Sequence, residues 1–133
     1  MGEYFKHWLE MGEKLGDKAP KIFNVNWFRT DDEGNFIWPG FGDNMRVLEW
    51  ILARCDGKAD ARQTAIGYVP YAKDINLEGL DLDIEQLEGL LEVDTALWQN
   101  EVGGIREFYA KFGDRLPAEL TRQLAKMEAN LKG

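Results

Sequence analysis

The stretch FNVNWFRTDDEGNFIWPGFGDNMRVLEW, residues Phe23–Trp50, decides how this chain folds. Its middle gathers large aromatic side chains: Trp27, Phe28, Phe36, Trp38 and Phe41. Phe41 stands between Gly40 and Gly42, just before a segment of helical periodicity. The pattern predicts a slot lined by these five aromatic residues, with a flexible rim, which is called the aromatic slot below.

The aromatic slot is predicted to sit on a hairpin. Residues 21–28 alternate in side-chain direction and read as a strand with one continuously apolar face. Residues 29–34 form a polar run ending in Gly34, the chemistry of a short loop whose last residue takes a positive φ. Residues 35–38 then return as the partner strand, and Pro39 ends the pairing because it has no backbone donor.

A helix follows the aromatic slot, with Gly42 or Asp43 as its N-cap. One stripe of this helix is apolar, with Val47 and Ile51 beside it: Met45, Leu48, Leu52 and Cys55. We expect the stripe to be buried against a sheet. Cys55, the single cysteine, is then a core residue and not a nucleophile, and it can form no internal disulfide.

The rest of the chain supplies mainly helices. Glu3–Leu15 is a predicted helix with an apolar inner side that includes Tyr4 and Trp8. Thr64–Val69 reads as a short strand stopped by Pro70. The region 71–82 has no firm period and is expected to wrap over the surface, pinned by four apolar residues: Ile75, Leu77, Leu80 and Leu82.

The C-terminal part is predicted to be largely helical. Asp83 and Gln86 resemble a capping box for a helix with an apolar stripe expected to make core or domain contacts: Ile84, Leu87, Leu90 and Leu91. A second helix starts near Asp94 and ends at Gly113, and a third begins at Pro117 with an apolar seam: Leu120, Leu124, Met127 and Leu131. The expected fold class is mixed α+β, a small sheet with a hairpin packed by helices, in one domain over residues 1–133 whose parts are 1–70 and 71–133.

The composition and net charge of the chain disfavour several classes of function. With 133 residues, 44% of them hydrophobic, the chain can bury one core. Its net charge of −8 disfavours nucleic acid or an anionic membrane as a partner. No apolar run approaches the about 20 residues that span a bilayer, and the N-terminus lacks a signal-peptide layout. We therefore expect a cytoplasmic location.

The aromatic slot has two readings from its residues alone. Large rings in hairpins are usually core. Glycine, however, gives Phe41 no side-chain neighbours, and a flat ligand such as a purine can stack on Phe28 or Phe41, which is worth about 1 to 3 kcal/mol per base. Backbone amides from Gly42 to Asn44 can read the polar edge of such a ligand. From its residues alone, the aromatic slot is a candidate binding site for a flat ligand.

Several motifs resemble the guanine-binding region of GTP-dependent phosphoenolpyruvate carboxykinase. They are VNWFR, an acidic turn, F-x-WPGFG-[DE]-N and RVLEW, with YFKHWLEMG and KAPKIF before them and IGYVP after them. The resemblance runs from about Tyr4 to Leu131 and is most specific over Ala19–Trp50. It implies a carboxy-lyase of gluconeogenesis that converts oxaloacetate and GTP to phosphoenolpyruvate, GDP and CO2.

The resemblance also assigns roles to residues. The family's equivalents of Phe28, Phe36 and Phe41 enclose the guanine ring, and those of Trp27 and Asn44 contact its edge. Each of these positions matches in this chain. With the backbone at Gly42 added, the nucleotide-binding residues implied are Trp27, Phe28, Phe36, Phe41, Gly42 and Asn44.

No residue of this chain is expected to be catalytic or to bind a metal. Phosphoryl transfer needs a phosphate-cradling loop and metal ligands, and no G-x-x-x-x-G-K-[ST] motif is present. In the family these parts, which serve Mn or Mg, lie upstream, so we expect a fragment that is inactive alone and whose partner is the N-terminal part of the enzyme. The alternative is a free-standing module that uses an exposed aromatic surface to hold a protein.

The roles of three charged features near the aromatic slot are also predicted from the sequence. The run Asp31, Asp32 and Glu33 invites a divalent cation, but a solvated hairpin tip is the preferred reading because consecutive side chains diverge. Arg29 is expected to be a solvated surface residue. Arg46 is expected to form a structural ion pair.

Overall fold

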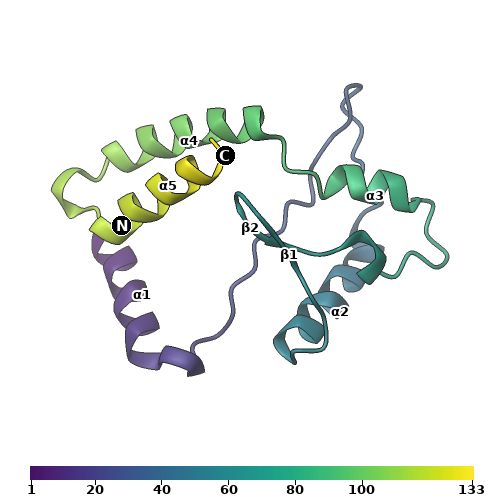
Figure 1. Ribbon diagram of the computed structural model, residues 1–133, viewed down its shortest axis with the longest axis horizontal. Coiled ribbons are helices and arrows are strands. Elements are labelled where there is room, and N and C mark those ends of the chain that lie inside the picture. The colour runs from purple at the N-terminus through teal and green to yellow at the C-terminus, as the bar shows by residue number, and fades with distance from the viewer. The chain divides into compact units, whose positions relative to one another are not determined.

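Five α-helices and one short antiparallel sheet make up the chain (Figure 1), and the predicted α+β class is confirmed. The computed structural model describes all of residues 1–133. Two compact units form: Met1–Pro20 with Val93–Gly133, and Lys21–Glu92. We call them the terminal unit and the central unit. The prediction of one domain over residues 1–133 stays a prediction.

In the terminal unit, α4 (Thr95–Ala110) and α5 (Ala118–Asn130) run antiparallel, side by side in Figure 1. The predicted start near Asp94 is confirmed, and the Asp94 carboxylate caps the helix by accepting the backbone N–H groups of two residues in the first turn of α4. Between the helices, Val102, Leu124 and Leu131 are buried. The α4 helix ends at Ala110, earlier than the predicted Gly113, which instead opens a 3-10 turn.

The first helix, α1 (Gly2–Leu15), forms as predicted. Its ring contact with the rest of the terminal unit lies in the first turn, where Phe5 meets Phe112 edge-to-face at 5.5 Å between ring centroids. Tyr4 and Trp8 are exposed, so the prediction that they face inward is wrong. They contact each other at 5.9 Å on the outer side of the helix.

In the central unit, β1 (Arg62–Thr64) pairs antiparallel with β2 (Gly67–Val69), in register Arg62 to Val69. The single strand predicted over Thr64–Val69 is therefore wrong. The chain reverses within it, and the Thr64 hydroxyl donates to the Gly67 carbonyl at 2.7 Å across the turn. A hydroxyl bonded to nearby backbone is a common way to close a turn.

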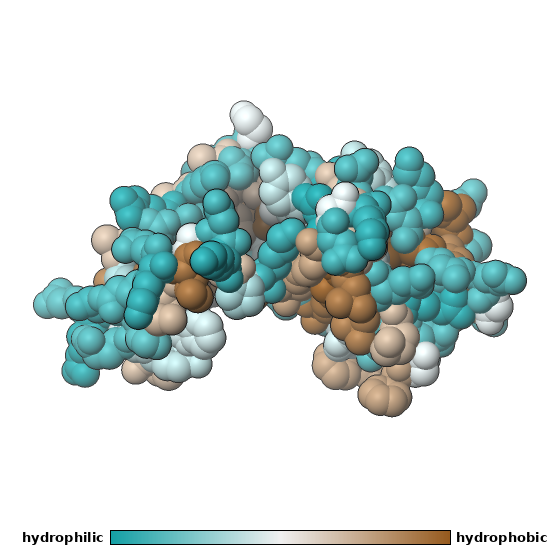
Figure 2. All heavy atoms as spheres, turned by 90° about the horizontal axis from the view of Figure 1, so that it is seen from below, coloured by the Kyte–Doolittle hydropathy of each residue, from teal (hydrophilic) through white to brown (hydrophobic).

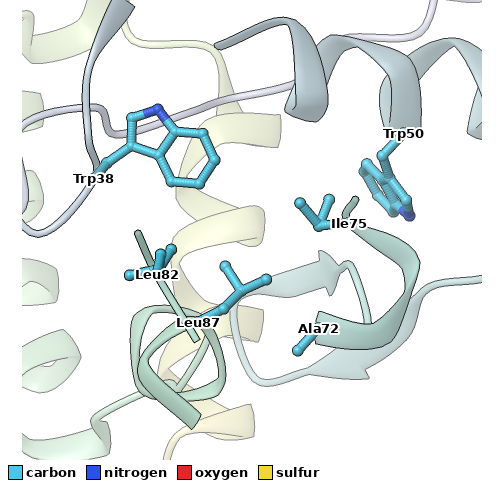
Figure 3. Close-up of a cluster of buried hydrophobic side chains, with 6 residues drawn as sticks. All are labelled: Trp38, Trp50, Ala72, Ile75, Leu82 and Leu87. Atoms are coloured by element: carbon cyan, nitrogen blue, oxygen red, sulfur yellow. The ribbon is translucent and has the colours of Figure 1, made fainter. Parts of the chain in front are cut away.

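The core of the central unit includes two tryptophans, Trp38 and Trp50, with Ile75 between them (Figure 3). Its buried members are Trp38, Trp50, Ala72, Ile75, Leu82 and Leu87. Ile75 and Leu82 confirm that the region 71–82 wraps over the unit and is pinned by its apolar residues. The helix α3 (Ile84–Leu90) starts at the predicted capping box, with Asp83 and Gln86 bonded to each other's backbone. In the predicted stripe of this helix, Leu87 is buried, Leu90 and Leu91 pack against the core, and Ile84 is exposed.

The helix α2 (Asn44–Cys55) forms as predicted but buries a different face. The predicted stripe of Met45, Leu48, Leu52 and Cys55 is exposed, and the core side carries Trp50 with Val47 and Ile51. The reason is that α2 packs on the wrapping region 71–82 and on Trp38, and not on a sheet. Figure 2 shows brown apolar residues reaching the surface among the polar ones. Cys55 is a free, exposed thiol and not a core residue.

The strand predicted over residues 21–28 does not form. Asn26 Oδ1 accepts the backbone N–H of Phe28 at 3.0 Å, at a turn over residues 27–28. Pairing is confined to one bridge between Thr30 and Phe36. None of the five helices is both long and apolar enough to cross a membrane.

Candidate functional site

Two rings of the aromatic slot stand on the narrow hairpin. Phe28 and Phe36 meet edge-to-face, with ring centroids 5.9 Å apart and planes at 62°. They are 72% and 64% exposed. The Ile37 N–H donates to the Arg29 carbonyl at 3.0 Å, which holds the two arms together below the rings. The hairpin therefore presents a paired ring surface to solvent.

The tip of this hairpin is held by one carboxylate. Asp31 Oδ1 accepts the backbone N–H groups of Asn35 at 2.8 Å and Glu33 at 3.0 Å. The bond from Asn35 lowers the pKa of the Asp31 carboxyl. Gly34 has a φ of 85°, the positive value predicted for the end of the loop. Backbone donors thus occupy Asp31, and no group of three or more acidic, His or Cys residues gathers to hold a metal ion.

Two arginines fasten the segments that carry the rings. Arg29 donates through Nη1 to the Leu90 carbonyl at 2.6 Å, at the end of α3, so its prediction as a solvated residue is wrong. The free last carbonyls of a helix attract such a cation. In Figure 1 the hairpin is the narrow blue loop near α3.

Arg46 forms the predicted ion pair, with Nε 3.0 Å from Asp43 Oδ1. It also donates through Nη1 to the Asn76 carbonyl at 2.7 Å and through Nη2 to the Glu78 carbonyl at 2.9 Å. One guanidinium therefore ties the start of α2 to the wrapping region 71–82. The planar fork of arginine is suited to such a three-way contact.

The third ring, Phe41, begins a 3-10 turn, Phe41–Asp43, that leads directly into α2. Gly40 before it has a φ of 117°, which a residue with a Cβ rarely adopts. Phe41 is 92% exposed and makes no ring contact with another aromatic residue. A Cβ built on Gly42 meets nothing within 4 Å, so the space beside Phe41 is open.

The two tryptophans of the aromatic slot lie inward of the phenylalanines. Trp38 is 7% exposed, and its ring centroid is 6.2 Å from that of half-buried Trp27. Trp38 donates its indole Nε1–H to Asn44 Oδ1 at 2.9 Å. The structure thus groups Phe28 with Phe36, and Trp27 with Trp38 and Asn44.

The link from Trp38 to Asn44 is the part of the site that sequence reasoning missed. A signal for it exists, because a buried indole N–H usually finds a partner. Asn44 is the polar residue six positions further on, at the first turn of α2.

A cavity of the central unit lies elsewhere. It holds about 370 Å³ and is lined by residues of both charge signs, among them Glu49, Lys58, Asp60 and Lys73. None of the predicted nucleotide-binding residues lines it. The aromatic slot is thus an open surface and not an enclosed cavity.

Comparison with known proteins identifies the family. The model described as "Phosphoenolpyruvate carboxykinase C-terminal P-loop domain" matches residues 1–130. This chain belongs to that family. Among curated relatives, "Phosphoenolpyruvate carboxykinase [GTP]" of Treponema pallidum (strain Nichols) is 50% identical over 135 residues, which is 100% of this chain and 22% of that protein. The enzyme of the same name from Chlamydia caviae is 48% identical over 133 residues, covering 99% of this chain and 22% of the relative.

A more distant carboxykinase gives the same coverage. The "Phosphoenolpyruvate carboxykinase [GTP]" of Corynebacterium kroppenstedtii is 41% identical over 132 residues, 99% of this chain and 21% of the relative. The chain therefore spans about a fifth of the length of these relatives. A protein-interaction module is not favoured, because the match to the carboxykinase family covers nearly every residue. The family description names a P-loop, and this stretch of sequence contains no P-loop motif.

Proposed function

We propose that this chain is the guanine-binding part of a GTP-dependent phosphoenolpyruvate carboxykinase. The whole enzyme converts oxaloacetate and GTP to phosphoenolpyruvate, GDP and CO2, a step of gluconeogenesis. The observation that carries the proposal is the set of three exposed phenylalanine rings on the hairpin and the turn before α2, within a chain of this family. Exposed rings of this size on a rigid support are suited to stacking a base.

In the proposed binding mode, guanine stacks between Phe28 and Phe41, and Phe36 closes the edge of the stack. The Phe28 and Phe36 rings already meet edge-to-face, so Phe36 supports the ring that stacks. Asn44 and the backbone at Gly42 read the polar edge of the base. Trp27, whose ring lies beside that of Trp38, contacts the edge of the base.

We assign phosphate binding and metal binding to parts of the enzyme other than this chain. The acidic residues of this chain do not fit a divalent cation, since they form no group of three or more ligands. We propose Mn or Mg and the N-terminal part of the enzyme as partners of the whole protein. We accordingly expect this chain by itself to bind the base and to catalyse no decarboxylation. The cytoplasmic location stays a prediction.

A titration tests base recognition directly. The ¹⁵N-labelled chain is titrated with GDP and, in parallel, with ADP, and backbone and side-chain amide shifts are followed by NMR. The proposal predicts that GDP moves the signals of Phe28, Phe41 and Asn44 at concentrations where ADP does not. If millimolar GDP leaves a dispersed spectrum unmoved, recognition of guanine by this chain is wrong.

Matched alanine variants show whether the rings carry the binding. Phe28→Ala and Phe41→Ala are each expected to weaken GDP binding about tenfold, because each removes one stacking face. Phe108→Ala is the control, since Phe108 is an exposed phenylalanine on α4, outside the aromatic slot. Equal losses in all three variants would contradict the assignment of the site.

A further inference from the structure

The hydrogen bond from Trp38 to Asn44 settles which way the asparagine amide faces. An indole N–H is a donor only, so the atom 2.9 Å from Trp38 Nε1 has to be the Asn44 oxygen, Oδ1. Trp38 cannot easily turn away, because it is 7% exposed and packs in the core with Leu82 and Leu87 (Figure 3). The Asn44 acceptor is therefore used inside the protein.

The other end of the amide is free. Asn44 Nδ2 has no hydrogen-bond partner in the chain, although the residue is half-buried. Asn44 follows Phe41 by three residues, and its backbone N–H bonds the Phe41 carbonyl at the end of the 3-10 turn. Side chains three apart on such a turn project in the same direction. The two N–H donors of the Asn44 amide are thus offered on the side of the Phe41 ring.

A donor at this place discriminates between purines. Guanine carries an acceptor, O6, at the position where adenine carries an amino group. A donor facing this position bonds guanine and leaves two donors opposed in adenine, and an unpaired buried polar group strongly disfavours the wrong base. If the Asn44 amide were reversed, its oxygen would instead accept from the adenine amino group.

We propose that Trp38 is the positioning residue for base selectivity: its indole N–H holds Asn44 Oδ1 so that Nδ2 donates to O6 of a 6-oxopurine. This inference rests on the proposed function. Trp38 contacts no base in this mechanism and acts only through the direction of the Asn44 amide. Loss of its N–H frees the amide to turn, which weakens guanine binding and improves adenine binding.

The chain offers a closely matched control in Trp50. Trp38 and Trp50 are 7% and 6% exposed and belong to the same core, but the Trp50 indole N–H has no partner. Trp38→Phe and Trp50→Phe therefore remove the same atoms from the same core, and only the first removes the bond to Asn44. We expect Trp38→Phe to lower the GDP-over-ADP affinity ratio about tenfold and Trp50→Phe to leave it unchanged.

Two further nucleotides separate positioning from a structural role. Inosine diphosphate keeps O6 and lacks the 2-amino group, whereas 2-aminopurine riboside diphosphate lacks O6 and keeps the amino group. Trp38→Phe should weaken GDP and inosine diphosphate by the same factor and leave the 2-aminopurine nucleotide unaffected. Equal weakening of all three nucleotides would overturn the proposal, because damage to the slot affects every base.

A second variant keeps the test decisive if Trp38→Phe is poorly folded. Asn44→Asp retains an acceptor for the Trp38 N–H and removes the outward donors, so its GDP-over-ADP ratio should also fall about tenfold while the Trp38 indole signal in the NMR spectrum stays in place. An unchanged ratio overturns the inference. If the unaltered chain itself shows no preference for GDP, the proposed function fails, and this inference fails with it.

Discussion

At the scale of single residues, Trp50 is the buried group without a partner. Its Nε1 lies in the core of the central unit with no hydrogen bond. An indole N–H that loses water and gains no acceptor is destabilising, although the rest of the ring contributes apolar burial. The two effects can be separated by substitution.

Trp50→Phe is expected to lower the free energy of unfolding by only about 1 kcal/mol, because the phenyl ring keeps most of the packing and removes the unpaired N–H. Trp50→Ala is expected to lower it by about 3 to 5 kcal/mol, because it leaves a large cavity. Urea denaturation followed by circular dichroism measures both. Equal losses would contradict this account, because they would mean that the phenyl ring restores none of the packing.

The two glycines beside Phe41 differ in their backbone. Gly40 has a φ of 117°, whereas Gly42 has no positive φ and has open space where a Cβ would stand. Gly40→Ala is expected to destabilise the chain by about 1 to 3 kcal/mol through backbone strain, and Gly42→Ala to change stability by less than about 1 kcal/mol. Thermal unfolding of the two variants side by side checks this. A larger loss of stability for Gly42→Ala than for Gly40→Ala would contradict the explanation by backbone strain at Gly40.

At the scale of elements, α2 depends on one arginine for its attachment to the wrapping region 71–82. Arg46 bonds Asp43 beside its own helix and the carbonyls of Asn76 and Glu78 across the unit. A lysine keeps the charge but has no planar fork to reach these groups together.

Arg46→Lys is expected to lower the free energy of unfolding by about 1 to 2 kcal/mol, because at least one bond to a carbonyl is lost. Amide hydrogen exchange of residues 71–82 should quicken with it. Arg122→Lys is the control, because Arg122 pairs with Glu119 on the exposed side of α5 and an exposed pair contributes little. Similar losses of stability in the two variants would contradict the role of Arg46 in attaching α2 to the wrapping region 71–82.

At the scale of the whole molecule, the apolar residues gather in two places. One hydrophobic cluster includes Leu87 in the central unit, and the other includes Val102 and Leu124 in the terminal unit. The predicted single domain over residues 1–133 requires that both lose their structure in one cooperative transition.

Leu87→Ala tests this cooperativity. The substitution is expected to lower the free energy of unfolding by about 2 to 5 kcal/mol, because Leu87 is fully packed. In a single domain, the amides of α4 and α5 lose exchange protection by the same amount as those of α2. Leu124→Ala is the reciprocal variant. If exchange protection falls only in the unit that carries the substitution, the two units are separate domains.

Much of this organisation was predictable because it depends on neighbours in the sequence. The capping box at Asp83, the start of α4 near Asp94 and the ion pair of Arg46 rest on interactions between residues a few positions apart. The wrapping of residues 71–82 was predicted from their lack of a regular period. The strand predicted over residues 21–28 was wrong because a strand needs a paired segment, and in this hairpin pairing is confined to the bridge between Thr30 and Phe36.

The sequence by itself determined the family, the five helices and the residues proposed to meet the nucleotide, because local periodicity and contiguous motifs carry that information. The buried face of α2 and the direction of the Asn44 amide became clear from the fold alone. Both depend on partners supplied from elsewhere: the wrapping region for Trp50, and the buried Trp38 for Asn44. A helical stripe shows that a face is apolar, but the packing of distant segments selects the face that leaves water.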